Sequence, residues 1–183
     1  MFLHAHFNKV LFLLLIFLGV TSCVKDVDLN QTKDISLQPK LQTDLLIFDV
    51  DENDFIDPET NRLRTVIKDT VRLEFLDDSY IQDDLDKVEF SFKYINTFPQ
   101  SFDTSIYLLS ENDNTQRRID LKVQPGSQDS PKTTEIIDFV NTDEIDQIKR
   151  SIKMVVEITV LPNSEAFEGE LQFQSKGLFY FVF

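Results

Sequence analysis

The sequence of 183 residues contains no tryptophan, a single cysteine and only two histidines. The histidines are His4 and His6, and the cysteine is Cys23. A single cysteine cannot form a disulfide within one chain, so packing has to hold the fold together. Beyond residue 23 there is neither imidazole nor thiol, which excludes Ser-His-Asp and Cys-His catalytic sites and histidine-ligated zinc or iron.

Glycine and positive charge are scarce as well. Of the four glycines, only Gly126, Gly169 and Gly177 lie beyond residue 22, and they stand too far apart to form a phosphate-binding loop. With 18 basic and 32 acidic residues, the net charge of −14 repels nucleic acids and anionic lipid head groups. We therefore expect no nucleotide and no nucleic-acid partner. Carboxylates this abundant usually form a solvated face, so we also expect no enzyme activity.

The amino-terminal segment has the layout of a secretory signal peptide. Lys9 precedes an unbroken apolar run at 10–18, and small residues follow before Cys23. A membrane-spanning helix needs roughly 20 predominantly apolar residues, and the charges that begin at Lys25 end this segment too early. We expect residues 1–22 to be removed, which leaves 17 basic and 32 acidic residues and a net charge of −15.

The end of this segment, Val20, Thr21, Ser22 and Cys23, resembles the lipobox of bacterial lipoproteins: a branched apolar residue, two small residues and a cysteine. The resemblance implies that Cys23 is lipidated and becomes the new amino terminus. Two or more acyl chains give the stable membrane anchoring that one chain cannot. The alternative is an incidental thiol behind an ordinary secretory signal.

The residues that follow the cysteine bear on the final location. Lys25 and Asp26 are similar to the surface-export signal of Bacteroidota-type lipoproteins, although Val27 interrupts the acidic run. The resemblance implies a lipid anchor in the outer membrane, with the cell surface favoured over a periplasm-facing orientation.

The mature chain divides into a tether and one domain. Residues 23–40 are polar without sustained periodicity, as expected of a tether that lifts a domain off a lipid surface. About 160 mature residues suffice for one core, because chains of that size bury roughly 70% of their unfolded surface. Most of the 17 phenylalanines lie beyond the signal peptide and supply apolar material, so we expect a single folded domain at 41–183.

Short segments in which apolar and polar residues alternate dominate this domain, and a period of two is typical of half-buried antiparallel strands. Gly177 suggests a bulge or tight turn before the last apolar run. One short helix is expected where Asn141 and Glu144 have the spacing of a capping box, with Ile145 and Ile148 on one face. The expected strands lie at 45–50, 70–75, 88–94, 102–109, 119–123, 133–140, 152–160, 171–173 and 178–183.

About seven to nine strands and one helix too short for a crossover predict an all-β fold, an antiparallel sandwich with an Ig-like pattern. The stretch 88–109, which holds the break at 96–99, is similar to the late-embryogenesis-abundant type 2 sandwich domains of some bacterial lipoproteins. The run 178–183 resembles the last strand of outer-membrane barrels and could also be donated between subunits. Burial as a central sandwich strand is the favoured interpretation.

The acidic stretch after the first expected strand is the strongest local cluster. Asp49, Asp51 and Asn53 resemble the opening of an EF-hand calcium loop, and Asp57 adds a further carboxylate. The stretch departs from that pattern at Asp54, where a glycine belongs, and lacks the bidentate glutamate. An acidic surface turn is favoured, with a weak calcium site as the alternative and no other cofactor or metal.

These observations favour a non-catalytic binding or accessory module of the cell envelope, held to the membrane by its lipid and to an envelope protein partner of unknown identity. Two alternatives stay open. A carboxylate-based hydrolase of surface polysaccharide would need a cleft with two acidic groups about 5–10 Å apart. A fimbrial or assembly subunit would need an open apolar groove or a displaceable terminal strand.

Overall fold

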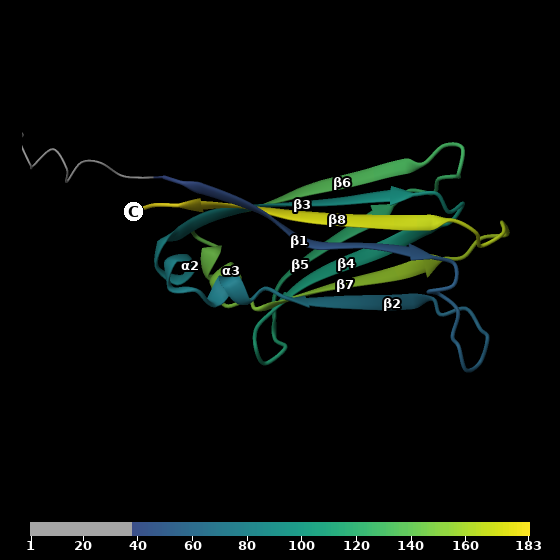
Figure 1. Cartoon of the computed structure of the whole chain (residues 1–183), viewed down its shortest axis with the longest axis horizontal. Coiled ribbons are helices and arrows are strands. Elements are labelled where there is room, and N and C mark those ends of the chain that lie inside the picture. The colour runs from purple at the N-terminus through teal and green to yellow at the C-terminus, as the bar shows by residue number, and fades with distance from the viewer. Residues whose placement is uncertain (1–37) are drawn as a thin grey trace, which may run out of the picture. The chain divides into compact units, whose positions relative to one another are not determined.

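A computed structural model of the chain describes residues 38–183, and in this part eight strands form two layers (Figure 1). Three short helical segments accompany them: η2 (Glu74–Asp77), α2 (Ser79–Asp84) and α3 (Ile145–Lys149). The strands are β1 (Lys40–Asp51), β2 (Val66–Arg72), β3 (Leu85–Asn96), β4 (Ser101–Leu109), β5 (Thr115–Val123), β6 (Lys132–Val140), β7 (Lys153–Leu161) and β8 (Glu170–Phe181).

Each layer is an antiparallel sheet of four strands. One sheet has the order β1-β8-β3-β6 and the other the order β2-β7-β4-β5. Strand β8 is therefore central, paired with β1 on one side and with β3 on the other. The predicted β-sandwich is confirmed, and the last apolar run lies in this central strand as far as Phe181, whereas Val182 and Phe183 beyond it are exposed.

The alternation of the sequence explains how the two layers meet. In β3 the alternate residues Val88, Phe90, Phe92 and Tyr94 are at most 1% exposed, and β7 buries every second residue in the same way. Because successive side chains of a strand point to opposite faces, each strand contributes one apolar face to a shared core. The core is rich in phenylalanine, and the rings of Phe92 and Phe173 stack with centroids 6.4 Å apart.

The expectation of one short helix was wrong. The strand expected at 70–75 ends at Arg72, and the chain turns into η2 and α2, which bury Leu76 and Ile81. Phe75 lies in η2 rather than in a strand, and its ring packs edge-on against Phe179 at 5.4 Å. These two short segments cover one end of the core, where β-strand pairing would leave it open.

The expected capping box of α3 does not form. Glu144 occupies the N-cap position without a side-chain cap, and its backbone N–H donates to the carbonyl of Asn141. The carboxylate of Glu144 instead lies 3.4 Å from the guanidinium of Arg117, which also forms a two-point ion pair with Asp138. The carboxylate of Glu144 therefore binds Arg117 on β5 and does not cap the helix.

Gly177 produces neither a bulge nor a turn, because β8 runs through it in continuous register with both neighbours. A side chain there would lie 2.5 Å from the ring of Phe179, so the glycine makes room for that ring. The irregularity falls instead in β1, between Asp44 and Ile47. Buried Ser175 binds it, since its hydroxyl accepts from Leu46 N at 2.9 Å and donates to Leu46 O at 3.0 Å.

The predicted signal peptide and most of the predicted tether lie outside the described residues, and with them Val20, Thr21, Ser22 and Cys23. The first strand begins at Lys40, within one residue of the expected start of the domain. Within residues 38–183, no helix has the length and apolar character needed to cross a membrane.

Candidate functional site

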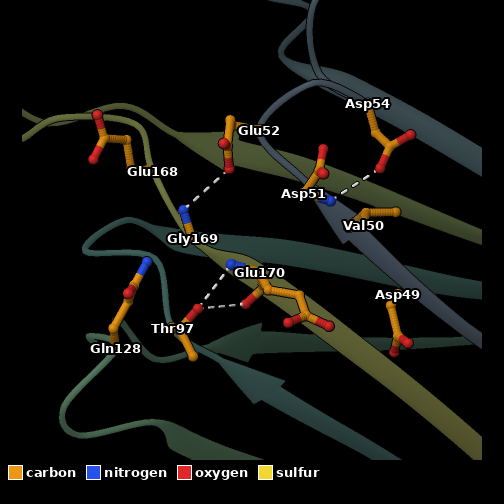
Figure 2. Close-up of a pocket in the computed structure, with 10 residues that line it drawn as sticks. All are labelled: Asp49, Val50, Asp51, Glu52, Asp54, Thr97, Gln128, Glu168, Gly169 and Glu170. Atoms are coloured by element: carbon orange, nitrogen blue, oxygen red, sulfur yellow. Dashed lines mark hydrogen bonds between the residues drawn. The ribbon is translucent and has the colours of Figure 1, made fainter.

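A pocket of about 610 Å³ lies at the end of the sandwich where β1 ends and β8 begins (Figure 2). Six of the ten residues around it are acidic, so cationic groups are attracted to it. We call it the acidic pocket. Its lining residues are Asp49, Val50, Asp51, Glu52, Asp54, Thr97, Gln128, Glu168, Gly169 and Glu170.

The register of two neighbouring strands brings most of these carboxylates together. Asp51 on β1 lies opposite Glu170 on β8, and Asp49 lies two residues further into the same strand. Residues separated by two positions share a face of a sheet, so Asp49 and Asp51 project to the same side. Glu52 and Glu168 belong to the loops that lead out of β1 and into β8. Segments more than 100 residues apart in sequence thus form one acidic surface.

Hydrogen bonds between Thr97 and the backbone of Glu170 hold one side of the acidic pocket. Its hydroxyl accepts from Glu170 N at 2.7 Å and donates to Glu170 O at 3.1 Å, and its own N–H donates to the same carbonyl at 2.9 Å. Gly169 precedes this contact with a φ of 153°, and a side chain there would lie 2.8 Å from Phe98 N. Glycine is therefore required where the chain enters β8.

The loop after β1 is held by its own carboxylates on one side and by an aromatic ring on the other. Asp51 Oδ1 accepts from Asn53 N at 2.7 Å, and Asp54 Oδ2 accepts from Asp51 N at 2.9 Å. Below them Phe55 is fully buried, with its ring centroid 5.3 Å from that of Phe167. The loop is therefore a polar turn that its own carboxylates hold by hydrogen bonds, and it packs on the buried ring of Phe55.

The structure separates the four residues of the expected calcium loop. Asp49 and Asp51 line the acidic pocket, whereas Asn53 and Asp57 do not. Asp57 Oδ1 accepts from the backbone N–H groups of Glu59 and Thr60, at 3.0 and 2.9 Å. Across residues 38–183, no three His, Cys, Asp or Glu side chains are grouped so that they could hold one metal ion. The weak calcium site stays a prediction, and these four residues do not form a shared ligand set.

The environment of Asp57 favours its ionised form. The hydrogen bond from Thr60 N, with further bonds from Glu59 N and the guanidinium of Arg64, lowers the pKa of Asp57 below its ordinary value of 3.8. Arg64 Nε lies 3.1 Å from Asp57 Oδ2. This carboxylate therefore organises the loop between β1 and β2.

A buried amide behind the pocket was missed by the sequence reasoning. Asn96 is fully buried, and its side-chain N–H groups donate to the carbonyls of Gln100 and Gln124 at 2.9 and 2.8 Å. Its side-chain oxygen accepts from Phe98 N at 2.8 Å. Gly126 lies so close to Asn96 O that a side chain there would approach it to 1.9 Å. The break at 96–99 was visible in the sequence, but the pairing of Asn96 with Gln124, on a loop 28 residues away, was not.

No protein-family model and no curated protein sequence matches the chain. Among solved structures it is similar to the VP2 subviral particle of infectious bursal disease virus, with a TM-score of 0.48 and 8% identity over 78% of this chain and 32% of that one. It is also similar to a predicted secreted protein of Parabacteroides distasonis, with a TM-score of 0.43 and 16% identity over 62% of this chain and 38% of that one.

A third similar structure is the enzymatically active domain of tailspike protein 4 of bacteriophage CBA120, with a TM-score of 0.35 and 11% identity over 81% of this chain and 19% of that one. The chain thus spans about a third of the length of the first solved proteins it matches. Likenesses at these values do not assign a family or an activity.

Proposed function

We propose that the chain is a lipoprotein anchored in the outer membrane through Cys23 and exposed on the cell surface. Its sandwich would serve as a non-catalytic binding or accessory module for an envelope protein. The observation that carries this proposal is the position of the lipobox-like run, which ends at Cys23 only 17 residues before the first strand at Lys40.

The direction of β1 supports a role in which the domain holds the acidic pocket out towards a partner. The strand begins with Lys40 opposite Tyr180 and ends with Asp51 opposite Glu170, at the acidic pocket. Twelve residues of strand cover roughly 35–40 Å at about 3.3 Å each. The chain therefore enters the sandwich at the end far from the acidic pocket, which leaves the pocket free for a partner.

The chemistry of the domain supports binding rather than catalysis. Beyond Cys23 the sequence supplies no imidazole and no thiol, and two of the pocket carboxylates, Asp51 and Asp54, accept hydrogen bonds from their own loop. A ring of carboxylates at a rim increases the association rate with a cationic partner surface. We expect the envelope partner to present lysine or arginine side chains to this end.

A carboxylate-based hydrolase is the second candidate, and the acidic pocket is the observation that favours it. Such an enzyme protonates a glycosidic oxygen with one carboxyl group and activates water or forms a covalent bond with another. Incubation of the protein with surface polysaccharide, followed by a reducing-end assay, tests this candidate. Release of sugar that is lost in both Glu168→Gln and Glu170→Gln would establish it against the binding module.

The fimbrial alternative requires a strand that can leave the fold. Strand β8 is hydrogen-bonded on both edges and buries Leu171, Phe173 and Phe179 completely. Removal of such a strand would expose most of one sheet's core face, which opposes a donated-strand role for β8.

The anchoring claim is tested by radiolabelled palmitate in cells. The unaltered protein should incorporate label and sediment with outer membranes, whereas Cys23→Ala should do neither. Protease treatment of intact cells should then degrade the anchored domain if it faces outward. A wild-type protein that stays unlabelled and keeps an alkylatable thiol would overturn the proposal.

The binding claim is tested by affinity capture of the acylated protein from native envelopes. A specific partner should copurify with wild type and be reduced in a variant that carries Asp49→Asn and Glu168→Gln. Asp103→Asn with Glu74→Gln provides a matched control, because it removes two exposed carboxylates that do not line the acidic pocket. Equal capture by both variants would show that the acidic pocket does not bind the partner.

A further inference from the structure

Apolar side chains are exposed at the end of the sandwich where the chain enters it. Leu41, Tyr80, Val182 and Phe183 are 41, 40, 43 and 55% exposed. In Figure 1 the start of β1, the helix α2 and the carboxyl-terminal residues lie at this same end. We call these four residues the apolar end.

Contacts between these segments make the apolar end one surface. Phe181 N donates to Pro39 O at 3.1 Å, and Val182 N donates to Asp84 O at 3.0 Å. The buried ring of Phe181 stacks with Phe183 at 6.2 Å and contacts Tyr80 at 5.9 Å. The exposed rings therefore extend an ordered aromatic row that begins in the core.

Single exposed apolar residues are ordinary on a protein surface, but four that gather around one point of the chain indicate an interaction site. This point is where the chain enters the fold. Only 16 residues, 24–39, separate Cys23 from Lys40, and a chain of that length reaches at most about 55 Å. Lipid on Cys23 would hold the apolar end at a high effective concentration next to the bilayer.

We propose that the apolar end rests on the lipid surface, with Phe183 and Tyr80 in the head-group region. The inference rests on the proposed anchoring through Cys23. Tyrosine and phenylalanine suit this place because aromatic side chains are favoured at the boundary between acyl chains and water. The contact orients the sandwich, so that the acidic pocket points away from the membrane.

The charges around the apolar end specify the lipid. Asp77, Asp78 and Asp83 are exposed near Tyr80, and the ammonium group of Lys40 lies over the Tyr180 ring at 4.8 Å. Acidic side chains are repelled by anionic head groups within a Debye length of about 8–10 Å. The surface that fits is therefore a zwitterionic or uncharged one, and anionic lipid should weaken the contact.

The absence of tryptophan allows a direct test, because any introduced tryptophan is the only one in the chain. The full acylated protein carrying Phe183→Trp is reconstituted into phosphatidylcholine vesicles with brominated acyl chains, which quench indole emission on contact. Ile47→Trp is the matched control, since Ile47 is 56% exposed but lies well along β1 from the apolar end. Palmitate incorporation is measured on the same samples.

We expect the indole at 183 to lose about half of its emission, since interfacial side chains sit about 5–10 Å deep, and the indole at 47 to keep nearly all of it. Admixture of phosphatidylglycerol should reduce the quenching at 183. Labelled protein with equal, weak quenching at both positions would overturn this inference and leave the anchoring intact. Emission at 183 that shifts to the blue without quenching would show that a second copy of the chain, not lipid, covers the apolar end, and would overturn the inference. Unlabelled protein would reject the anchoring and this inference together.

Discussion

At the acidic pocket, loops converge on buried hydrogen-bonding side chains, whereas at the apolar end short helices and strand ends leave hydrophobic side chains in solvent. The first arrangement depends on polar groups such as Asn96 and Thr97, which pair with backbone atoms of Gln124 and Glu170 in distant parts of the sequence. The second depends on rings such as Phe75 and Phe181, which pack without directional bonds. Aromatic packing occurs at both ends, as between Phe55 and Phe167 below the pocket, so the ends differ in how much they depend on buried polar side chains.

This difference follows from what each end has to cover. Irregular loops carry backbone N–H and C=O groups that no sheet satisfies, so a loop-rich end needs buried side chains to pair with them. At the apolar end, η2 and α2 satisfy part of their own backbone, and one side chain, that of Gln82, donates to the carbonyls of Leu76 and Lys149 at 2.7 and 2.9 Å. Loss of a buried polar side chain at the pocket should therefore be costly, and loss of an exposed apolar side chain at the apolar end should be mild.

The largest effect is expected for Asn96→Ala. The change leaves two carbonyls and the N–H of Phe98 without their buried partner, and each such group costs about 1–3 kcal/mol, so the free energy of unfolding should fall by roughly 3–5 kcal/mol. Denaturant unfolding of the full chain measures it. Exposed Asn112→Ala serves as the control, and a loss below that of Ser175→Ala would break the proposed difference between the ends.

Ser175→Ala acts between the two ends, at the irregular point of β1. Its hydroxyl exchanges two hydrogen bonds with the backbone of Leu46, so its removal should reduce the free energy of unfolding by about 1–2 kcal/mol. Hydrogen exchange should rise mainly in β1, since this edge strand pairs with β8 alone. Exchange that rises uniformly across both sheets would contradict a local role, and Ser91→Ala provides the comparison.

Asp57→Asn should have a smaller, pH-dependent effect. Hydrogen bonds from Thr60 N and Glu59 N, with help from Arg64, hold the pKa of Asp57 below its ordinary value of 3.8. A lowered folded pKa stabilises the fold above the unfolded pKa, and this contribution is lost as the pH falls through the folded value. Thermal melts of wild type and variant should thus differ at pH 7 and converge below about pH 3.8. If the difference in melting temperature between wild type and variant does not change with pH, the effect of the substitution comes from packing and not from the charge of Asp57.

The smallest effect is expected for Phe183→Ser at the apolar end. Its side chain is 55% exposed and contacts Phe181 on one face, so the free energy of unfolding should change by no more than about 0.5 kcal/mol. Denaturant unfolding in the absence of lipid checks this. A loss as large as that of Asn96→Ala would show that both ends depend equally on their packing.

Period-two alternation predicted the sandwich because it reports directly which face of a strand is buried. The segments expected at 102–109 and 133–140 match β4 and β6 to within one residue at each end. The helical pair η2 and α2 was not predicted, since each is shorter than two turns and its apolar residues fit either period. Their conformation is set by the core that they cover, not by local preference.

The acidic pocket was only half visible in the sequence. Asp49 and Asp51 belong to a run of carboxylates that is evident in the sequence itself. Glu168 and Glu170 reach the same place through the pairing of β1 with β8, and Thr97 reaches it through the pairing of β3 with β8. No local pattern records either pairing. Asp57 was grouped with them by its spacing, but its hydrogen bonds turn it towards its own loop.

The central position of β8 has a kinetic consequence. Both of its neighbours precede it by a long stretch of chain, with Lys40 opposite Tyr180, so one whole sheet cannot close until this strand has been synthesised. Pairings this distant in sequence slow folding, because the chain loses entropy when a large loop closes, before the native contacts between the strands can form. Late folding would suit the proposed export of this chain, because a narrow secretory channel admits an extended chain.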